Sequence, residues 1–189
     1  YLAPPPAGAP PLQVYRTSGT SSGVRKAIYY SEEDDRRYVD IRTSIVGRWL
    51  AGSGVRTALA DMGTGHAAST ALDVFRRLGL TGEAISFELP VSHHLSKLRE
   101  LRPELLYTMP SILERIAQAS DDPSAYGIRR IWLVGEVASP AWQRGMAARF
   151  GIGAEDVLDT VGSIEIGTVA AWSHAHGRYV LADGLVAEG

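Results

Sequence analysis

Short apolar segments alternate with helix-like segments along most of this chain, and that alternation limits the possible folds more than any other feature. Strands are predicted at residues 55–62, 83–89, 105–108, 130–134 and 156–160. Helices are predicted between them, at residues 66–78, 92–101, 110–119 and 140–150. Repeated strand, helix and strand units form a mainly parallel sheet with helices on both faces. The sequence therefore predicts a three-layer α/β fold whose ligands bind beyond the carboxyl ends of the strands.

The two ends of the chain are predicted to be built differently. Residues 1–11 contain five prolines and are expected to form an extended lead-in before a folded region at 12–189. Two short strands are expected at 12–15 and 27–30. A helix should follow, with Ser31 as its cap, acidic residues in its first turn and an end before Gly52. Residues 166–172 and 178–182 are expected to form a hairpin.

Composition excludes several classes of partner and chemistry. The formal net charge of −2 gives no general attraction for nucleic acid or for an anionic membrane. The chain has no cysteine, which excludes disulfides, thiolate metal sites and a cysteine nucleophile and is compatible with a reducing cytoplasm. No apolar run approaches the roughly 20 residues that a membrane-spanning helix needs. We therefore expect a cytoplasmic protein that binds neither nucleic acid nor membrane.

The segment from Arg16 to Lys26 is rich in glycine and hydroxyl side chains and lies between two predicted strands. Glycines allow successive backbone N–H groups to turn toward one point, and serine and threonine hydroxyls add further donors, so the segment suits a phosphate. A flexible linker is the alternative. A Walker loop is excluded because Val24 follows Gly23. The segment also matches the Gly-x-Ser-x-Gly pattern of serine hydrolases, but no helix is predicted after it.

Other segments with distinctive chemistry follow the predicted strands. They are residues 63–66, 107–111, 135–136 and 159–165. Since the carboxyl ends of parallel strands meet at one edge, these segments are expected to be loops that line one crevice. A carboxylate opposite a phosphate-binding loop is the arrangement that holds Mg²⁺, and the candidates are Glu136 and Glu165.

Four motifs occur in a fixed order along residues 14–189. They are Thr17-Ser18-Gly19-Thr20-Ser21-Ser22-Gly23 with Lys26, Met109-Pro110-Ser111, Gly135-Glu136-Val137, and Val161-Gly162-Ser163-Ile164-Glu165. In this order they resemble the motifs of the adenylate-forming enzyme superfamily, and most closely those of phenylacetate–coenzyme A ligases and their relatives. The resemblance implies that ATP and a carboxylic acid, with an aryl acid favoured, give an acyl adenylate and pyrophosphate. The acyl group would then pass to a thiol of coenzyme A or of a carrier protein.

The same resemblance implies roles for individual residues, with ATP and Mg²⁺ as cofactors. Catalysis would depend on Thr20, Lys26, Ser163 and Glu165, of which Glu165 would hold the metal. The nucleotide would be bound by residues of all the motifs, namely Thr17, Ser18, Gly19, Thr20, Ser21, Ser22, Gly23, Lys26, Gly135, Glu136, Asp159, Val161, Gly162 and Ser163. Gly65, His66, Tyr107, Pro110 and Ser111 would contact the acid. Residues 12–189 would then be part of an N-terminal adenylation domain, without the family's lysine-bearing C-terminal domain, and a homodimer is one possible assembly.

Two other functions remain open from the sequence. Residues 63–68 read Gly-x-Gly-x-x-Ala between a strand and a helix, with Glu83 and Glu88 further on, which is a pattern of NAD or S-adenosylmethionine sites. A relative that binds nucleotide without catalysis is the second alternative. The histidine pairs at 93–94 and 174–176 lack spaced acidic partners and are expected to be surface imidazoles and not metal ligands.

Overall fold

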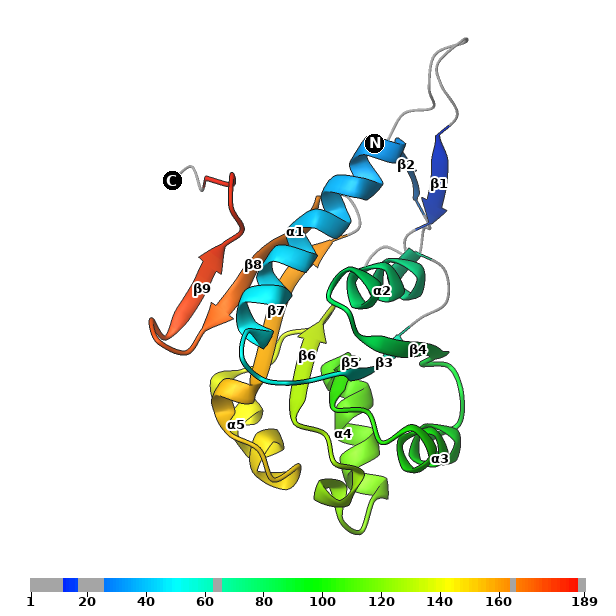
Figure 1. The fold of residues 1–189 in the computed structure, drawn as a ribbon, viewed down its shortest axis with the longest axis vertical. Helices are drawn as coiled ribbons and strands as arrows, with labels where there is room; N and C mark the ends of the chain where they lie inside the picture. The colour runs from blue at the N-terminus through cyan, green and yellow to red at the C-terminus, as the bar shows by residue number, and fades with distance from the viewer. Residues whose placement is uncertain (1–11, 17–25, 63–65, 164–165, 187–189) are drawn as a thin grey trace.

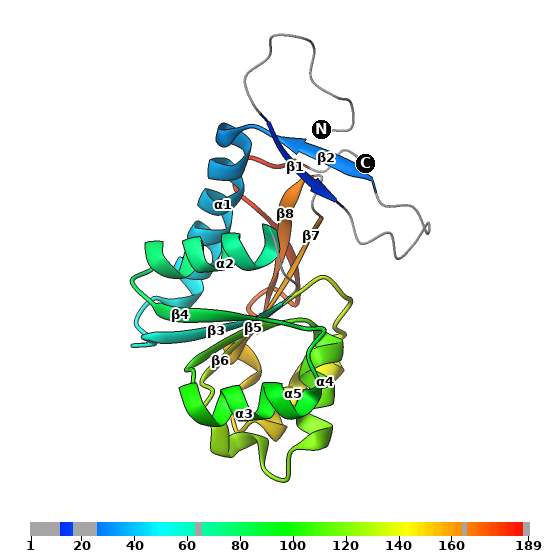
Figure 2. The same ribbon diagram turned by 90° about the vertical axis from the view of Figure 1, so that its right-hand side faces the viewer.

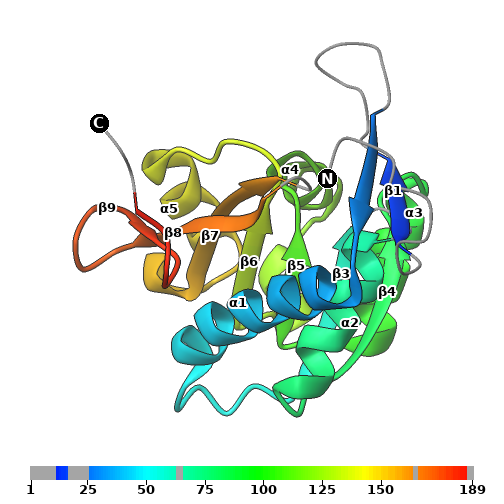
Figure 3. The same ribbon diagram turned by 90° about the horizontal axis from the view of Figure 1, so that it is seen from above.

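The computed structural model describes residues 12–16, 26–62, 66–163 and 166–186, and its centre is a seven-stranded sheet. Across the sheet the strands follow the order β4 (Thr81–Ser86), β3 (Thr57–Met62), β5 (Leu105–Thr108), β6 (Arg130–Val134), β7 (Val157–Ser163), β8 (Gly167–Ser173) and β9 (Arg178–Leu181). The strands from β4 to β7 are parallel neighbours, whereas β8 and β9 add as antiparallel strands. Figure 3 shows this order from above. The predicted parallel sheet and the predicted hairpin are both confirmed.

Helices cover both faces of the sheet, as predicted. One face carries α1 (Glu32–Leu50) and α2 (His66–Arg77). The opposite face carries α3 (Val91–Leu101), α4 (Pro110–Ala119) and α5 (Pro140–Arg149). Figure 2 shows the two helical layers above and below the parallel strands. None of the helices in these described ranges combines the length and the apolar character needed to cross a lipid bilayer.

Alternating side chains in the strands explain the two apolar cores. Every residue of β5 is buried, with Leu105 and Tyr107 packed toward α1 and α2 and Leu106 packed toward α3, α4 and α5. Successive side chains of a strand point to opposite faces, so a strand covered on both sides must be apolar throughout. The short apolar runs of the sequence are therefore the interior strands of the sheet.

The first turn of α1 is fixed by its cap. The Ser31 hydroxyl accepts a hydrogen bond from the backbone N–H of Asp34, and the Asp34 carboxylate accepts one from the backbone N–H of Ser31. This reciprocal arrangement satisfies two backbone donors that the helix would otherwise leave unpaired. The acidic side chains of the first turn also interact favourably with the positive end of the helix dipole. The predicted helix start is confirmed.

A second, smaller sheet lies beside the start of α1 (Figures 1 and 2). It consists of β1 (Gln13–Arg16) and β2 (Ala27–Tyr30), which pair as antiparallel strands. The rings of Tyr15 and Tyr30 meet edge to face at 5.5 Å, and Tyr30 meets Tyr38 of α1 in the same way at 6.3 Å. These aromatic contacts fix the pair of strands against the helix. Two short 3-10 helices, η1 (Pro123–Tyr126) and η2 (Ala154–Asp156), precede β6 and β7.

The strands β4 and β7 differ most from the prediction at their ends. β4 begins at Thr81 and ends at Ser86, whereas a strand was predicted at 83–89. The backbone turns after Ser86, where the N–H of Leu89 donates to the Ser86 carbonyl just before Pro90, the N-cap residue of α3. β7 continues to Ser163, whereas a strand was predicted at 156–160. β7 is longer because its last residues pair with β8, a partner that the local pattern does not show.

Candidate active site

The carboxyl ends of the central parallel strands lie at one edge of the sheet. Asp61 of β3 pairs in register with Thr108 of β5, Thr108 pairs with Leu133 of β6, and Leu133 pairs with Asp159 of β7. Asp61, Thr108 and Leu133 are the last or next-to-last residues of their strands. The connections that follow β3, β5 and β6 therefore start side by side at the edge where the sequence predicted them.

The strand order indicates where a ligand is expected at this edge. From β3 the chain passes through α2 to β4 on one side, and it then returns through α3 to β5 on the other side of β3. The direction of winding reverses between β3 and β5, and ligands of open α/β sheets bind at such reversal points, beyond the strand ends. Segments 63–66 and 109–111 follow the two strands concerned.

Two of the predicted site segments are joined directly. The backbone N–H and the hydroxyl of Ser111, in the first turn of α4, each donate to the carboxylate of Glu136 at 2.7 Å. Glu136 follows β6, and its charge lies at the positive end of α4, where backbone donors lack partners within the helix. The two residues line a recess of about 380 Å³ together with Pro110, Val137 and Trp142. Glu136 therefore connects the segments after β5 and β6.

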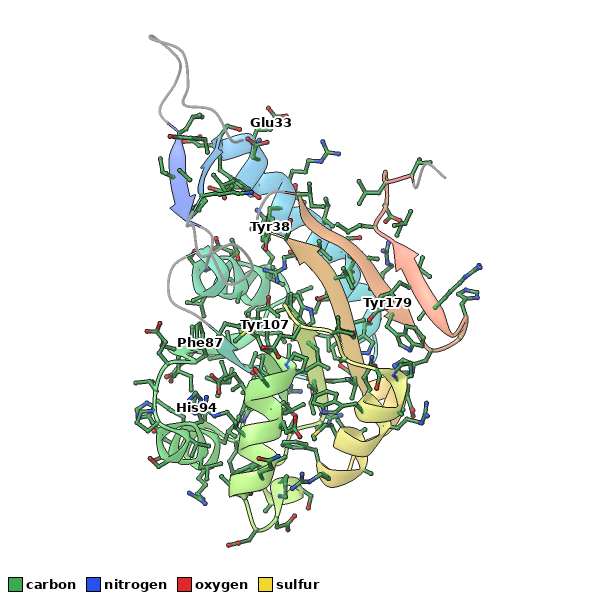
Figure 4. The ribbon with its side chains drawn as sticks, turned by 180° about the vertical axis from the view of Figure 1, so that it is seen from behind. Glu33, Tyr38, Phe87, His94, Tyr107 and Tyr179 are labelled. Carbon is green, nitrogen blue, oxygen red and sulfur yellow. The ribbon has the colours of Figure 1, made fainter. Side chains whose placement is uncertain are left out.

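Asp159 is a buried carboxylate whose partners come from two other elements. The Tyr179 hydroxyl of β9 donates to Asp159 Oδ2 at 2.5 Å, and Gln143 Nε2 of α5 lies 3.4 Å from the same oxygen. Figure 4 shows Tyr179 on the red strand. Asp159 Oδ1 and Gln143 Oε1 are buried acceptors without a hydrogen-bond partner in the described structure. Burial raises the pKa of the Asp159 carboxyl, and the hydrogen bond from Tyr179 offsets part of that rise.

Two exposed valines lie near this edge, one in the segment after β6 and one in β7. Val137, just after β6, is 95% exposed, and Val161 in β7 is 47% exposed. Val134 of β6 pairs in register with Thr160 of β7. Val137 follows Val134 along the chain, and Val161 follows Thr160 directly. These exposed valines provide apolar surface beyond the ends of adjoining strands, where a flat base could pack.

Gly162 occupies an irregular position in β7, where the register with β8 shifts. A Cβ atom at this residue would overlap the carbonyl oxygen of Gly167 and lie 2.9 Å from the Cα of Thr168. Both neighbours are backbone atoms of β8, which cannot rotate away. Glycine is thus required for the close approach of β7 and β8 beside Ser163.

Replacing Gly162 with alanine is expected to lower the free energy of unfolding by about 1 to 3 kcal/mol, the usual cost of forcing an extra carbon into a packed site. Thermal unfolding measures the change. Gly145→Ala is the matched control, because a Cβ atom there meets nothing within 4 Å in the exposed part of α5, and it should raise stability by about 0.5 to 1 kcal/mol. Equal melting temperatures for the two variants would contradict the close-approach argument.

Tyr107, predicted to contact the acid, is fully buried. Its ring stacks on Trp132 with centroids 3.9 Å apart, and its hydroxyl is hydrogen-bonded by Arg42 of α1. Burial raises the pKa of Tyr107 to about 12, and the nearby charge of Arg42 opposes this rise. A contact between Tyr107 and the acid stays a prediction. Arg42, which is 2% exposed, was not identified from the sequence as a core or site residue.

His94 is buried, and the prediction of a surface imidazole at this position is wrong. Its Nδ1 lies 2.6 Å from Asp61 Oδ2, and its Nε2 lies 2.9 Å from the carbonyl oxygen of Leu89. His94 and Asp61 are 1% and 0% exposed. Burial raises the pKa of the Asp61 carboxyl, while the hydrogen bond and charge of His94 oppose that rise. The pair anchors the end of β3, directly before residues 63–65. His93, one residue earlier, is exposed as predicted.

Several predicted site residues lie outside the described part of the chain. They are Thr17, Ser18, Gly19, Thr20, Ser21, Ser22, Gly23, Gly65 and Glu165, together with the side chain of His66. Lys26 is an exposed residue at the start of the described segment that leads into β2, and Ser163 is an exposed residue at the end of β7. The assigned roles of these residues stay predictions. Within the described residues no group of three or more metal-binding side chains is present.

The dinucleotide alternative predicts an acid at the end of the strand after the glycine-rich turn. Glu83 instead lies in the middle of β4, where it pairs with Leu59, and its carboxylate accepts a hydrogen bond from Lys97 at 3.2 Å. Glu88 follows the end of β4 and remains the residue on which this alternative depends. Glu83 is therefore not at the strand end where this alternative needs an acid.

Comparison with known proteins gives one curated relative for this chain. No protein-family model matches. Over 166 residues the chain is 45% identical to fumarate–(S)-2,3-diaminopropanoate ligase of Enterobacter agglomerans, a match that covers 87% of this chain and 41% of the relative. The chain thus spans about two fifths of the length of that ligase.

Solved structures show the same fold at low sequence identity. A 2-hydroxyisobutyryl-CoA ligase in complex with its acyl adenylate and CoA matches 87% of this chain and 39% of its own, with 17% identity and a TM-score of 0.64. An amide bond synthetase, McbA of Marinactinospora thermotolerans, matches 85% of this chain and 30% of its own, with 18% identity and a TM-score of 0.60. The chain is thus similar in sequence to part of a ligase, and it shares its fold with the corresponding parts of these two enzymes.

Proposed function

We propose that the full-length protein activates a carboxylic acid with ATP and Mg²⁺ as an acyl adenylate. The observation that carries this proposal is the 45% identity over 166 residues to a ligase that is named for a carboxylic acid, on a fold shared with a structure that holds an acyl adenylate. In this reaction a carboxylate oxygen of the acid forms a bond to the α-phosphorus of ATP, and the bond from that phosphorus to the β-phosphate oxygen breaks. Pyrophosphate leaves, and no protein nucleophile is needed.

The nucleotide would bind at the carboxyl ends of β6 and β7. The exposed valines at 137 and 161 supply an apolar surface for the base, and Ser163 at the end of β7 supplies a hydroxyl for the α-phosphate. The phosphate-binding loop predicted at residues 17–26 would hold the other phosphates. Two anions meet in this reaction, so backbone N–H groups and basic side chains aimed at the phosphates contribute most to the rate.

Mg²⁺ would neutralise phosphate charge during the transfer. The acids described at this edge do not offer it a ligand set, because Glu136 accepts both donors of Ser111. Asp61 is buried with His94, and Asp159 is buried with Tyr179. The proposal therefore assigns the metal to Glu165, as the resemblance implies. One carboxylate is sufficient for a cation that takes most of its other ligands from phosphate and water.

The acid is proposed to be fumarate or another short dicarboxylic acid, because the curated relative is named for fumarate. That name also points to an amine as the acceptor of the acyl group, whereas the resemblance implied a thiol and favoured an aryl acid. We propose an amine as the acceptor, since the alignment with this relative covers 87% of the chain at 45% identity. Attack of the amine on the acyl carbon forms an amide and releases AMP.

Isotope exchange between pyrophosphate and ATP tests the first step with the full-length protein. We expect exchange that depends on fumarate and Mg²⁺, with little exchange when fumarate is replaced by phenylacetate. Addition of (S)-2,3-diaminopropanoate should then release AMP, and coenzyme A in its place should not. ATP binding by calorimetry without exchange for any acid would favour the non-catalytic alternative, and a rise in melting temperature with NAD alone would favour the dinucleotide alternative.

A further inference from the structure

Arg42 of α1 is a charged side chain enclosed in the core. It is 2% exposed, and its guanidinium carbon lies 5.0, 5.2 and 4.9 Å from the ring centroids of Tyr38, Tyr107 and Trp132. Arg42 Nη1 donates to the Thr70 hydroxyl at 3.4 Å, and Nη2 donates to the Tyr107 hydroxyl. The contacts come from two helices and two strands, so the position of the guanidinium group is well defined. Figure 4 labels two of these residues, Tyr38 and Tyr107.

All these partners are neutral near pH 7. Within the described residues no carboxylate lies at ion-pair distance from Arg42, and its Nε is a buried donor without a hydrogen-bond partner. Buried arginines are normally paired with an anion, because an isolated charge in a protein interior is costly. The three aromatic rings stabilise the cation in part but accept no hydrogen bond from Nε. The structure thus has a buried positive charge that its described side chains do not neutralise.

Two partners of the guanidinium group belong to elements beside the reversal point of the sheet. Tyr107 is the next-to-last residue of β5, and Thr70 belongs to α2, the helix that follows β3. These are the two strands between which the winding of the sheet reverses. A ligand bound at the reversal point would have the Arg42 side chain on the face of the sheet that α1 and α2 cover.

We propose that Arg42 binds the second carboxylate of the acid and so selects dicarboxylic over monocarboxylic substrates. This inference rests on the proposed function. A guanidinium group binds a carboxylate through two parallel N–H donors, and Nε with the second N–H of an Nη is such a pair. The hydroxyls of Thr70 and Tyr107, which accept the other N–H donors, would hold the guanidinium group in position. The distal carboxylate would neutralise the buried charge while the other carboxylate extends toward the α-phosphate.

The test compares three acids in the exchange assay with the full-length protein. Fumaric acid has both carboxylates, monomethyl fumarate masks one of them, and crotonic acid replaces it with a methyl group. The wild type should favour fumarate over the other two by about 100-fold in kcat/KM, because a site built for a buried charged partner rejects ligands that lack it. Arg42→Met should lose most of this preference, because its kcat/KM should fall for fumarate and stay the same for the other two acids. Arg42→Lys should keep part of the preference.

Arg48→Met is the matched control, since Arg48 is on the same helix, is exposed and pairs with Asp183 at the surface. It should keep the wild-type preference. An equal loss for all three acids in folded Arg42→Met protein would overturn the proposal, because Arg42 would then serve the reacting carboxylate or only the fold. Equal use of the three acids by the wild type would overturn it as well.

Two further readouts cover the remaining outcomes. If no acid supports exchange, the proposed function fails, and calorimetry of fumarate binding then decides the inference. The inference is supported if fumarate binds the wild type and does not bind Arg42→Met. It is overturned if fumarate binds both proteins equally or does not bind the wild type. If Arg42→Met does not fold, Arg42→Lys and the wild-type preference carry the test. A wild-type preference for fumarate that Arg42→Lys reduces supports the proposal, and an unchanged preference in Arg42→Lys overturns it.

Discussion

The His94→Leu variant is expected to unfold about 6 to 12 °C below the wild type, because removal of one partner from a buried pair lowers the free energy of unfolding by about 3 kcal/mol or more. His94 and Asp61 are 1% and 0% exposed, and their side chains are 2.6 Å apart. Leucine would leave the Asp61 carboxyl buried without its partner and the Leu89 carbonyl without the donor from Nε2. Asp61 Oδ1 already lacks a hydrogen-bond partner in the described structure.

The neighbouring histidine supplies the control for this measurement. His93→Leu makes the same chemical change one residue away on the exposed side of α3, and it should change stability by about 0.5 kcal/mol or less. The double variant with Asp61→Leu and His94→Leu should be more stable than His94→Leu alone, since replacing both members of a buried pair costs less than stranding one. Equal melting temperatures for His93→Leu and His94→Leu would show that the buried pair contributes nothing.

The two histidines also show what local sequence cannot predict. The bounds of α4 and β6 agree with the prediction because their signals are local: a proline at the first helical turn, and a short apolar run. Whether His93 or His94 is buried depends on the rotation of α3 about its axis, which packing against the sheet decides. The partner, Asp61, is 33 residues earlier in the chain. Buried polar pairs of this kind are set by tertiary contacts.

Arg42 was missed for a related reason. In α1, Tyr38 and Ile45 belong to a set of apolar residues at helical spacing, and both side chains pack inward. A basic residue on such a face is expected to extend its charge to water. Here three aromatic rings from different elements enclose it instead. The residue types that make this enclosure are spread over almost 100 positions, from Tyr38 to Trp132, so no local window contains the signal.

The candidate site was predictable in its location but not in its contacts. Alternation of strands and helices was sufficient to place the segments after β5 and β6 at one edge, and the structure confirms that edge. The bidentate contact between Ser111 and Glu136 depends on how α4 and the segment after β6 pack together, which spacing does not reveal. The extension of β7 to Ser163 likewise depends on β8, which follows it.

The Glu165→Gln variant of the full-length protein is expected to lose acid-dependent pyrophosphate exchange by about 100-fold or more, on the scale of removing one electrostatic contributor from a phosphoryl-transfer site. Glutamine keeps the shape of the side chain and removes only the charge, so the fold should persist. Calorimetry should show weaker Mg²⁺-dependent ATP binding, and a higher Mg²⁺ concentration should recover part of the exchange if the carboxylate holds the metal.

Glu100→Gln on the exposed side of α3 is the control and should leave exchange unchanged. The three acids described at the strand ends, Asp61, Glu136 and Asp159, already have side-chain partners, so the proposed metal site depends on Glu165. Exchange within twofold of the wild type at every Mg²⁺ concentration would remove the metal from this residue and the proposed mechanism with it.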